Sequence, residues 1–458
     1  MTASESVKYE ILQDYLEKTP CSKKQDSIAK TVMPGGDTRW STYYKPYPLH
    51  MDKADGCYLV DVDGNRYIDL QNNYTVLVHG HRHPEILNAV STQMQKDIIF
   101  GAPAEIQIEL ASIITKRLPG VSKVRFTNSG TEATMMAMRT ARAFMKRDII
   151  LKMDGGYHGS HDYAEVNITP DSGDAELPTA RVEKNGIPES ILNGVMVARM
   201  NNISSVEKIL KKYSNDIAAV IIEPVMNAAG IIPADETFLR DLRKLTDEYN
   251  VLLIFDEVVT MRLHENGLQG KYQIIPDITA LGKVIGGGFA IGAFGGREDI
   301  MEWFDPAKVN GFHHSGTFNG HNLAMAAGAA SLRLLDRQSI DRINRFGVLL
   351  RDGIRRVAAE NGIWEQTTQV GSLLYFHWSE KPVLAASDIP RWKKRAGELP
   401  RLLHLELLNR GIFSANRGLL NISTPMTEKE IGMTIEALDG SLNRLKPYIS
   451  ENCPHLLH

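Results

Sequence analysis

The sequence has few cysteines, little net charge and no long apolar run. Its three cysteines, Cys21, Cys57 and Cys453, are widely spaced, which excludes a disulfide framework and a CxxC metal pair and is typical of a reducing compartment. The net charge of −3 gives no field that would draw the chain to nucleic acid or anionic lipid. No apolar run approaches the roughly 20 residues of a membrane span, and the polar N-terminus lacks the apolar core of a secretory signal. We therefore expect a cytoplasmic protein with no nucleic-acid or membrane partner.

What the sequence does contain is a series of short apolar runs that alternate with helical stretches, from about Pro84 to Asp336. Examples are "KVRFTNSG", "DIILKMDGG", "IAAVIIEPV" and "VLLIFDEVV". Such runs without polar alternation are typical of strands buried on both faces of a parallel sheet. We predict a large three-layer α/β domain over residues 71–336 and a smaller α+β domain over residues 337–458. Ligands of such sheets bind beyond the carboxyl ends of the strands.

The N-terminal segment, residues 1–70, is expected to be a mobile arm with an entry loop, followed by a hairpin that joins the small domain. In "GCYLVDVDGNRYIDL" alternating apolar residues flank Asp63-Gly64, which is a strong two-residue hairpin signal. The aspartates of this stretch could also suggest a calcium-binding loop, but such a loop would need its glycine later and a glutamate at its twelfth position, so we favour the hairpin. A polar stretch from about Glu165 to Ser190 is either a lid or a surface loop, and its length does not decide between them.

Three stretches at predicted strand ends carry chemistry. In "FTNSGTEA" a strand turns into a helix at Ser129, Gly130 and Thr131, whose N–H groups and hydroxyls would form an anion-binding turn. The alternative is an ordinary capped helix start. Neither a Walker A motif nor GxGxxG is present in this stretch, which lowers the case for a nucleotide as the anion.

The second stretch, "IFDEVVT", ends a buried strand with Asp256 and Glu257. Consecutive strand residues face opposite sides, so the two carboxylates cannot act together, and one of them points into the site. The third is "LGKVIGGG", where Lys283 lies in a glycine-rich, nearly apolar surround that should disfavour its ammonium form. We expect Gly286, Gly287 and Gly288 to leave space for a flat, bulky group near the amine.

An anion-binding turn, a strand-end aspartate and a desolvated lysine are the three contacts that pyridoxal 5'-phosphate needs. The sequence also resembles the class III, fold-type I family of pyridoxal-phosphate-dependent aminotransferases, close to the glutamate-1-semialdehyde aminomutase group. The resemblance covers nearly the whole chain. It rests on motifs that occur in order: "KADGCYLVDVDGNRYID", "HGHRHPEI", "FTNSGTEA", "GGYHG", "IIEPV", "FDEV", "LGKVIGGG" and "SGTFNGHNLAMAAG".

The resemblance implies roles for individual residues. Lys283 would form the Schiff base with the cofactor, and Asp256 would pair with its pyridine nitrogen. The phosphate would be bound by Ser129, Gly130 and Thr131. The aromatic ring of Tyr157 would stack on the cofactor, with Val258 on the other face of the ring and His158 as a further cofactor residue. Thr317 would reach the phosphate in the neighbouring subunit of a homodimer with shared sites, and Glu223 would have a supporting role.

Two arginines bear on the substrate, because arginine grips a carboxylate at two points. Arg39 lies in "PGGDTRWSTYY" and Arg417 in "FSANRGLL". Both motifs look like the branch that transaminates β-amino acids, notably aromatic ones, where the first arginine holds the carboxylate of the β-amino acid and the second that of the keto acid. The expected reaction therefore moves an amino group from a β-amino acid or related amine to 2-oxoglutarate, pyruvate or a similar acid. Intramolecular aminomutase activity is the alternative, and a protein that binds the cofactor without turnover is a third.

Two groups of histidines could suggest a metal site, but we expect neither of them to bind a metal. The alternate spacing of His79, His81 and His83 would place them on one side of a strand, with no carboxylate or thiol to join them. The pair His313 and His314 is interpreted in the same way. Met135, Met136 and Met138 are predicted to pack a helix against the sheet.

Overall fold

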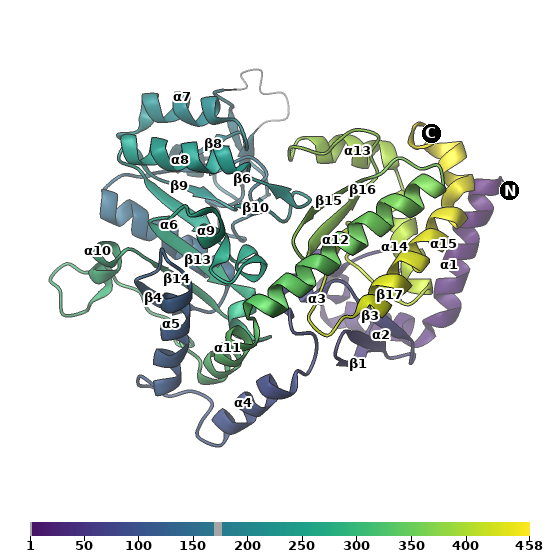
Figure 1. Cartoon of the computed structure of the whole chain (residues 1–458), viewed down its shortest axis with the longest axis horizontal. Coiled ribbons are helices and arrows are strands. Elements are labelled where there is room, and N and C mark those ends of the chain that lie inside the picture. The colour runs from purple at the N-terminus through teal and green to yellow at the C-terminus, as the bar shows by residue number, and fades with distance from the viewer. Residues whose placement is uncertain (1, 169–175) are drawn as a thin grey trace. The chain divides into compact units, whose positions relative to one another are not determined.

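The computed structural model describes residues 2–168 and 176–458, and the chain forms two compact units. One unit comprises residues 84–340 and the other comprises residues 1–83 together with 341–458. The unit boundaries thus fall after residues 83 and 340, whereas the predicted domain boundaries fall after residues 70 and 336. Figure 1 labels most of the elements of both units.

The unit of residues 84–340 is built on a seven-stranded sheet. In spatial order its strands are β4 (Lys123–Thr127), β14 (Gly292–Gly296), β13 (Ile278–Gly282), β12 (Leu252–Asp256), β9 (Ile217–Ile222), β5 (Ile149–Met153) and β8 (Val195–Ala198). Neighbouring strands are parallel except where β14 runs antiparallel to both β13 and β4. The predicted mostly parallel α/β sheet is therefore confirmed, and all four quoted apolar runs form strands of it.

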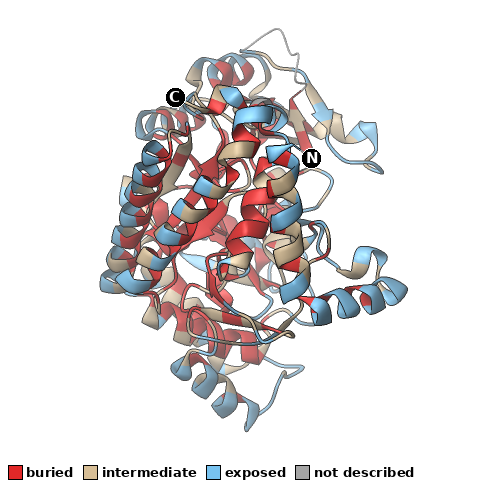
Figure 2. Ribbon diagram, turned by 90° about the vertical axis from the view of Figure 1, so that its right-hand side faces the viewer, coloured by how far each residue is buried: buried red, intermediate tan, exposed pale blue. Residues whose placement is uncertain are grey.

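Helices of this unit cover the sheet. They are α4 (Pro84–Met94), α5 (Glu105–Arg117), α6 (Gly130–Met145), α7 (Ile203–Tyr213), α8 (Glu236–Glu248), α9 (Gly267–Tyr272), α10 (Glu298–Met301) and α11 (Asn322–Leu334). Every residue of β9, β12, β13 and β14 is buried, which explains why their sequences lack polar alternation. Figure 2 shows the burial colours, with exposed residues on the outer faces of helices. Met136 and Met138 of α6 belong to the core, and Met135 packs against it, as predicted.

The unit formed by the two chain ends contains two smaller sheets. One has the order β1 (Met51–Asp55), β2 (Tyr58–Asp61), β3 (Arg66–Asp69) and β17 (Ile412–Phe413). The other has the order β15 (Gln366–Val370), β16 (Leu373–His377) and β18 (Leu419–Asn421). Strands β2 and β3 form the predicted hairpin, and β3 pairs in parallel with β17. Its C-terminal part contains the helices α12 (Arg337–Glu360), α13 (Asp388–Ala396), α14 (Leu399–Asn409) and α15 (Glu428–Asn452). Helix α12 begins four residues before the unit boundary at residue 341.

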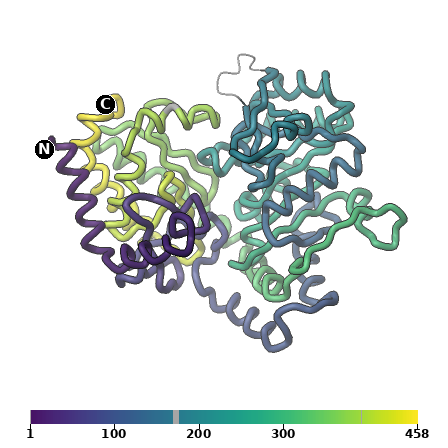
Figure 3. Tube along the Cα trace, turned by 180° about the vertical axis from the view of Figure 1, so that it is seen from behind, coloured from purple at the N-terminus to yellow at the C-terminus, as the bar shows by residue number. Residues whose placement is uncertain are grey.

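The segment predicted as an N-terminal arm contains two helices, α1 (Ala3–Lys18) and α2 (Pro20–Val32). Thr2 and Glu5 cap α1 reciprocally, and Val7, Ile11 and Tyr15 recur every four residues on its buried face. The Tyr15 hydroxyl donates to the carbonyl of Tyr47 at 2.8 Å. Figure 3 shows the purple N-terminal helix beside the yellow C-terminal helix α15, which it contacts.

The polar stretch near residues 165–190 is only partly described, since residues 169–175 lie outside the described residues. On either side of them β6 (Val166–Ile168) and β7 (Ala180–Val182) pair antiparallel. Two further short strands, β10 (Val225–Met226) and β11 (Ile232–Pro233), also pair antiparallel. Among the helices of the described ranges, none has the length and apolarity that crossing a membrane requires.

Candidate cofactor and substrate site

The predicted cofactor residues of residues 84–340 follow the carboxyl ends of parallel strands. Ser129 comes two residues after β4, Asp256 ends β12, and Lys283 follows β13 directly. Strands β12 and β13 are neighbours in the sheet, with Asp256 opposite Ala280. The strand order thus places these groups at the edge of the sheet where ligands of such folds bind.

The turn before α6 is a helix cap that leaves N–H groups available. The Ser129 hydroxyl accepts from the N–H of Glu132 at 3.1 Å, and Glu132 Oε2 accepts from the N–H of Asn128 at 2.7 Å. The first N–H groups of a helix, here those of Gly130 and Thr131, have no partner within the helix. The ordinary cap and the anion-binding turn are therefore compatible, because the cap occupies the N–H of Glu132 and not those of Gly130 and Thr131.

Close packing brings this turn against the neighbouring strand ends. A Cβ atom at Gly130 would lie 3.1 Å from Val258 Cγ1. A Cβ atom at Gly282 would lie 3.2 Å from the same methyl group and 3.4 Å from the Cα of Gly130. Val258 is thus in close contact with Gly130 at the start of α6 and with Gly282 before Lys283. The absence of a side chain at the two glycines allows this contact.

Asp256 is held by two donors at the end of β12. Its Oδ2 lies 2.8 Å from His158 Nδ1, and its Oδ1 accepts from the N–H of Val258 at 3.1 Å. Both Asp256 and His158 are buried, and burial lowers the pKa of His158 so that the neutral imidazole donates to the carboxylate. His158 Nε2 is buried without a hydrogen-bond partner in the described part of the chain.

Glu257 contacts a different set of groups, as the strand alternation predicts. Its carboxylate accepts from the Thr260 hydroxyl at 3.0 Å and from the N–H groups of Leu268 and Gln269 at 2.7 and 3.1 Å. These N–H groups lie at the start of α9, so Glu257 fixes that helix to the sheet. Asp256 is the carboxylate that faces the other candidate site residues.

Glu223, which follows β9, is a second buried carboxyl group beside Asp256. Its Oε1 accepts from the N–H of Tyr157 at 2.8 Å, and its Oε2 accepts from the N–H of Asn227 at 3.3 Å. Burial and then the negative charge of Asp256 raise the pKa of Glu223 to about 8, although the N–H groups and the ammonium of Lys283 oppose the shift. Burial beside Asp256 therefore favours the protonated form of the Glu223 carboxyl group.

Lys283 begins a short 3-10 turn (Lys283–Gly286) and has a left-handed backbone with φ of 51°. Such a conformation is costly for a residue with a side chain, and it concentrates at functional sites. The expectation that the following glycines leave space for a bulky group is wrong for two of them. A Cβ atom at Gly286 would lie 2.4 Å from Ile291 Cγ2, and one at Gly287 would lie 2.4 Å from the carbonyl oxygen of Ala327. These glycines allow the turn to pack against the protein.

The segment after β5 connects several site residues. Tyr157 is half-exposed, and the neighbouring Gly159 has φ of 92°. A Cβ atom at Gly159 would lie only 2.5 Å from Thr131 Oγ1, and the N–H of Ser160 donates to this hydroxyl at 3.3 Å. The Thr134 hydroxyl donates to the carbonyl of His158 at 2.5 Å. Sequence reasoning missed Ser160 and Thr134, whose only signal is their position beside recognised motifs.

Thr317 is exposed in the segment before α11 and makes none of these contacts. His314 accepts a hydrogen bond from Arg125 Nε at 3.1 Å through Nδ1, and its ring packs on Phe294. The expectation for the other histidines is corrected in two respects: residues 79–83 form no strand, and a carboxylate contacts one of the three, since Asp69 Oδ2 lies 2.8 Å from His81 Nε2. Among the described residues no group of three or more His, Cys, Asp or Glu side chains is placed to hold a metal ion.

The two predicted substrate arginines lie in the other unit and contact adjacent residues there. Arg39 donates from NH1 to Asn73 Oδ1 at 2.6 Å, and the guanidinium carbon of Arg417 lies 5.4 Å from the centre of the Tyr74 ring. The Tyr74 hydroxyl donates to the carbonyl of Ser41 at 2.7 Å. Residues that are far apart in the sequence are thus gathered around one short turn.

That turn, α3 (Asn72–Thr75), is strained. Its four residues all have positive φ, between 46° and 78°, although none is glycine. A left-handed backbone costs roughly 1–2 kcal/mol per residue. The buried Asn72 side chain stabilises the turn by donating to the carbonyl of Asn421 at 2.7 Å. Runs of this kind persist where the surrounding structure enforces them, and they cluster at ligand sites.

Cavities adjoin both arginines. Arg39, Tyr44, Asn73 and His404 are among the residues that line a cavity of about 210 Å³. Arg417, Trp392 and His404 help to line a smaller one of about 20 Å³. Burial lowers the pKa of His404, which belongs to both, to about 3, so its imidazole is neutral.

Comparison with known proteins agrees with the geometry. The family model described as aminotransferase class-III matches residues 40–397. A glutamate-1-semialdehyde 2,1-aminomutase from Ignicoccus hospitalis is 39% identical over 422 residues, which are 91% of this chain and 97% of the relative. A solved β-phenylalanine aminotransferase from Variovorax paradoxus is 34% identical, with a TM-score of 0.87 and coverage of 98% of this chain and 99% of its own. A transaminase solved with PLP bound is 35% identical, with a TM-score of 0.86 and coverage of 95% and 99%.

These matches confirm the predicted resemblance, the fold type and the enzyme class, with pyridoxal phosphate as the cofactor. The family match spans most of the chain, and both solved structures cover almost all of it. The chain belongs to the class-III aminotransferase family.

Proposed function

We propose that the protein moves an amino group from a β-amino acid, aromatic ones included, to a keto acid such as 2-oxoglutarate or pyruvate. The observation that carries this proposal is the pair of arginines around the left-handed turn, Arg39 at Asn73 and Arg417 at Tyr74. A donor and an acceptor that each bear a carboxylate call for two cationic groups, and arginine suits planar carboxylates. We assign Arg39 to the carboxylate of the β-amino acid and Arg417 to that of the keto acid.

The residues of the other unit fit pyridoxal phosphate. The N–H groups of Gly130 and Thr131 and the Ser129 hydroxyl suit its phosphate, because a helix start favours anions. Asp256, oriented by His158 and the N–H of Val258, is an acid partner for the ring nitrogen. Tyr157 and Val258 would hold the faces of the ring. Thr317 is assigned to the cofactor of the neighbouring subunit, in a homodimer that works in the cytoplasm.

When bound, pyridoxal phosphate supplies an aldehyde that condenses with amines and a ring that accepts the electron pair left when a proton leaves the amine-bearing carbon. The Lys283 amine is the group that would take this proton and deliver it to the former aldehyde carbon of the cofactor, on the other side of the amino nitrogen, so it serves as base and then as acid. Asp256 would keep a proton on the ring nitrogen, which lets the ring accept electrons. Arg39 would orient the donor so that the bond to be broken stays aligned.

The experiment measures the two half-reactions separately in wild type, Arg39→Ala and Arg417→Ala. Loss of a charge-assisted hydrogen bond of about 1.5–3 kcal/mol corresponds to a roughly 10- to 100-fold lower kcat/KM. We expect Arg39→Ala to lose this much with a β-amino acid and to keep its rate with an amine that has no carboxylate. Arg417→Ala should lose it with the keto acid only, so each variant is the control for the other. A β-amino acid that reacts no better than a simple amine, or that is untouched by Arg39→Ala, would refute the assignment.

The second candidate is intramolecular amino transfer, which the 39% identity to an aminomutase favours. A mutase converts one substrate completely without any acceptor. A transaminase given only the donor stops after one turnover, with the amino group left on the cofactor. Product quantification with donor alone therefore separates the two reactions.

A further inference from the structure

Lys152 is a charged side chain in the middle of a buried strand. It lies in β5 among apolar residues, and it is 1% exposed. Burying an ammonium group is costly unless its hydrogen-bond donors are satisfied. Its Nζ donates to the carbonyls of Ala164 and Val166, at 2.7 Å each. Burial lowers the pKa of Lys152 to about 8, against the opposing charges of Glu183, Glu223 and further acidic residues.

Both carbonyls lie at the end of residues 154–165, which we call the cofactor segment, where the chain enters β6. Between β5 and β6 the segment reaches three parts of the candidate site. The backbone N–H of Tyr157 donates to the carboxyl group of Glu223, and His158 Nδ1 is hydrogen-bonded to Asp256. The N–H of Ser160 donates to the Thr131 hydroxyl. The segment thus leaves β5 two residues after Lys152, contacts the site and is tied back to the same lysine.

We propose that Lys152 is a positioning residue for the cofactor, which acts by tying the end of the cofactor segment to β5 so that Tyr157 and His158 stay in place. The inference rests on the cofactor contacts proposed above. A leucine or methionine would suit the apolar surroundings better, yet it would leave two carbonyls without a donor. A lysine satisfies both, and its flexible stem reaches from the strand to the returning chain.

The chain offers a matched control for this tie. Arg147 lies just before β5 and donates from NH1 to the carbonyls of Ile217 and Asn250, at 3.2 and 2.6 Å. These carbonyls lie at the amino ends of β9 and β12, at the edge of the sheet opposite to the candidate site. Arg147→Met therefore removes a cation from two backbone carbonyls without touching the cofactor segment.

The test compares wild type, Lys152→Met and Arg147→Met as full-length proteins freed of cofactor. Three quantities are measured: the free energy of unfolding, the Kd for pyridoxal phosphate and the amide hydrogen exchange of residues 154–165. We expect Lys152→Met to raise the Kd by roughly tenfold or more, which corresponds to the loss of about one buried hydrogen bond, and to speed exchange in the segment. Arg147→Met should lower stability and leave both other quantities at wild-type values.

Equal Kd values for Lys152→Met and wild type, or an equal rise for Arg147→Met, would overturn the inference. If Lys152→Met does not fold, Lys152→Gln, which keeps N–H donors without a charge, takes its place and must raise the Kd above the wild-type value. A wild-type protein that fails to bind pyridoxal phosphate would instead refute the proposed function. The two failures are therefore distinguishable.

Discussion

His158 Nδ1 lies 2.8 Å from Asp256 Oδ2, although His158 comes from the segment after β5 and Asp256 is the last residue of β12. Both side chains are buried, and the other oxygen of Asp256 accepts from the N–H of Val258. The carboxylate therefore has a fixed orientation before any ligand binds. An acid that must hold a proton on a ring nitrogen benefits from such preorganisation.

Replacement of His158 tests this arrangement. His158→Leu removes one of the two donors to Asp256 and leaves a buried carboxylate partly unsatisfied, which costs about 1–3 kcal/mol. We expect a roughly tenfold or greater loss in kcat and in affinity for pyridoxal phosphate. His158→Asn, which retains a donor, should recover part of both. Identical kcat and Kd in His158→Leu and wild type would show that the contact has no role in the site.

The raised pKa of Glu223 predicts a pH dependence of stability. The folded protein keeps the proton up to about pH 8, whereas the unfolded chain loses it near the ordinary value of 4.5. Between these values the folded state binds more protons, so this group makes stability fall as pH rises. Glu223→Gln cannot titrate, and the difference in unfolding free energy, variant minus wild type, should rise across this window by up to about 1.4 kcal/mol per pH unit. Denaturant unfolding at several pH values measures it, and parallel curves would contradict the raised pKa.

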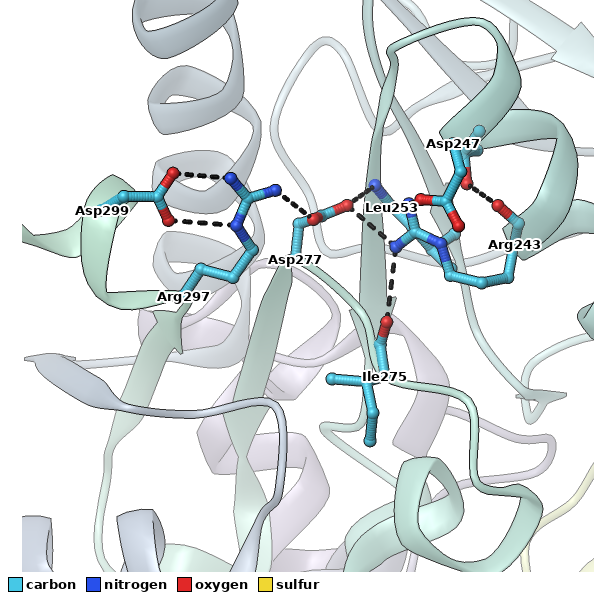
Figure 4. Close-up of polar contacts among 8 residues, drawn as sticks. Arg243, Asp247, Leu253, Ile275, Asp277, Arg297 and Asp299 are labelled. Carbon is cyan, nitrogen blue, oxygen red and sulfur yellow. Dashed lines mark hydrogen bonds and ion pairs between the residues drawn. The ribbon is translucent and has the colours of Figure 1, made fainter.

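Asp277 directly precedes β13, at the edge of the sheet opposite to the candidate site. Figure 4 shows how its side chain contacts Leu253, Arg243 and Arg297. Its carboxylate accepts from the N–H of Leu253 at 2.7 Å, from Arg243 at 2.9 Å and from Arg297 at 2.7 Å. Breaking a largely buried network of this kind should lower the unfolding free energy by about 2–4 kcal/mol in Asp277→Asn. The exposed Asp299, which pairs with Arg297 as well, provides the control, and Asp299→Asn should cost less than about 1 kcal/mol. A similar loss in both variants, or weaker cofactor binding in Asp277→Asn, would contradict this division of roles.

Gly159 tests the contact between the cofactor segment and the start of α6. In Gly159→Ala the new methyl group would meet Thr131 Oγ1 at 2.5 Å, so the segment or the helix start must shift. Gly186 has a similar φ, 88° against 92°, but open space around it. Gly186→Ala therefore measures the backbone strain alone, about 1–2 kcal/mol. We expect only Gly159→Ala to weaken pyridoxal phosphate binding, and equal binding by both variants would show that the contact is dispensable.

The sequence was informative where local patterns decide the outcome. Buried parallel strands have a distinctive composition, and the residues after them must lie at one edge, so Asp256 and Lys283 could be placed there in advance. The helices of residues 3–32 were equally predictable: Thr2 and Glu5 form a capping box, and apolar residues recur every four positions along α1. The prediction of an arm for this segment did not specify them.

Other features depend on contacts that no local pattern encodes. The left-handed turn at residues 72–75 contains no glycine, and only its asparagines tolerate that conformation readily, so propensity argues against it at Tyr74 and Thr75. The surroundings enforce it, through Asn421 and neighbouring groups. The roles of Gly286 and Gly287 were misjudged for the same reason, because the atoms that crowd them belong to Ile291 and to the distant Ala327.

The most direct test of the central claim is to map the covalent attachment of pyridoxal phosphate. Purified protein is incubated with the cofactor and reduced with borohydride, and its peptides are analysed by mass spectrometry. The account predicts a stably modified Lys283 and no modification or turnover in Lys283→Ala. Attachment at another lysine, or a Lys283→Ala variant that converts its amine at the wild-type rate, would contradict it.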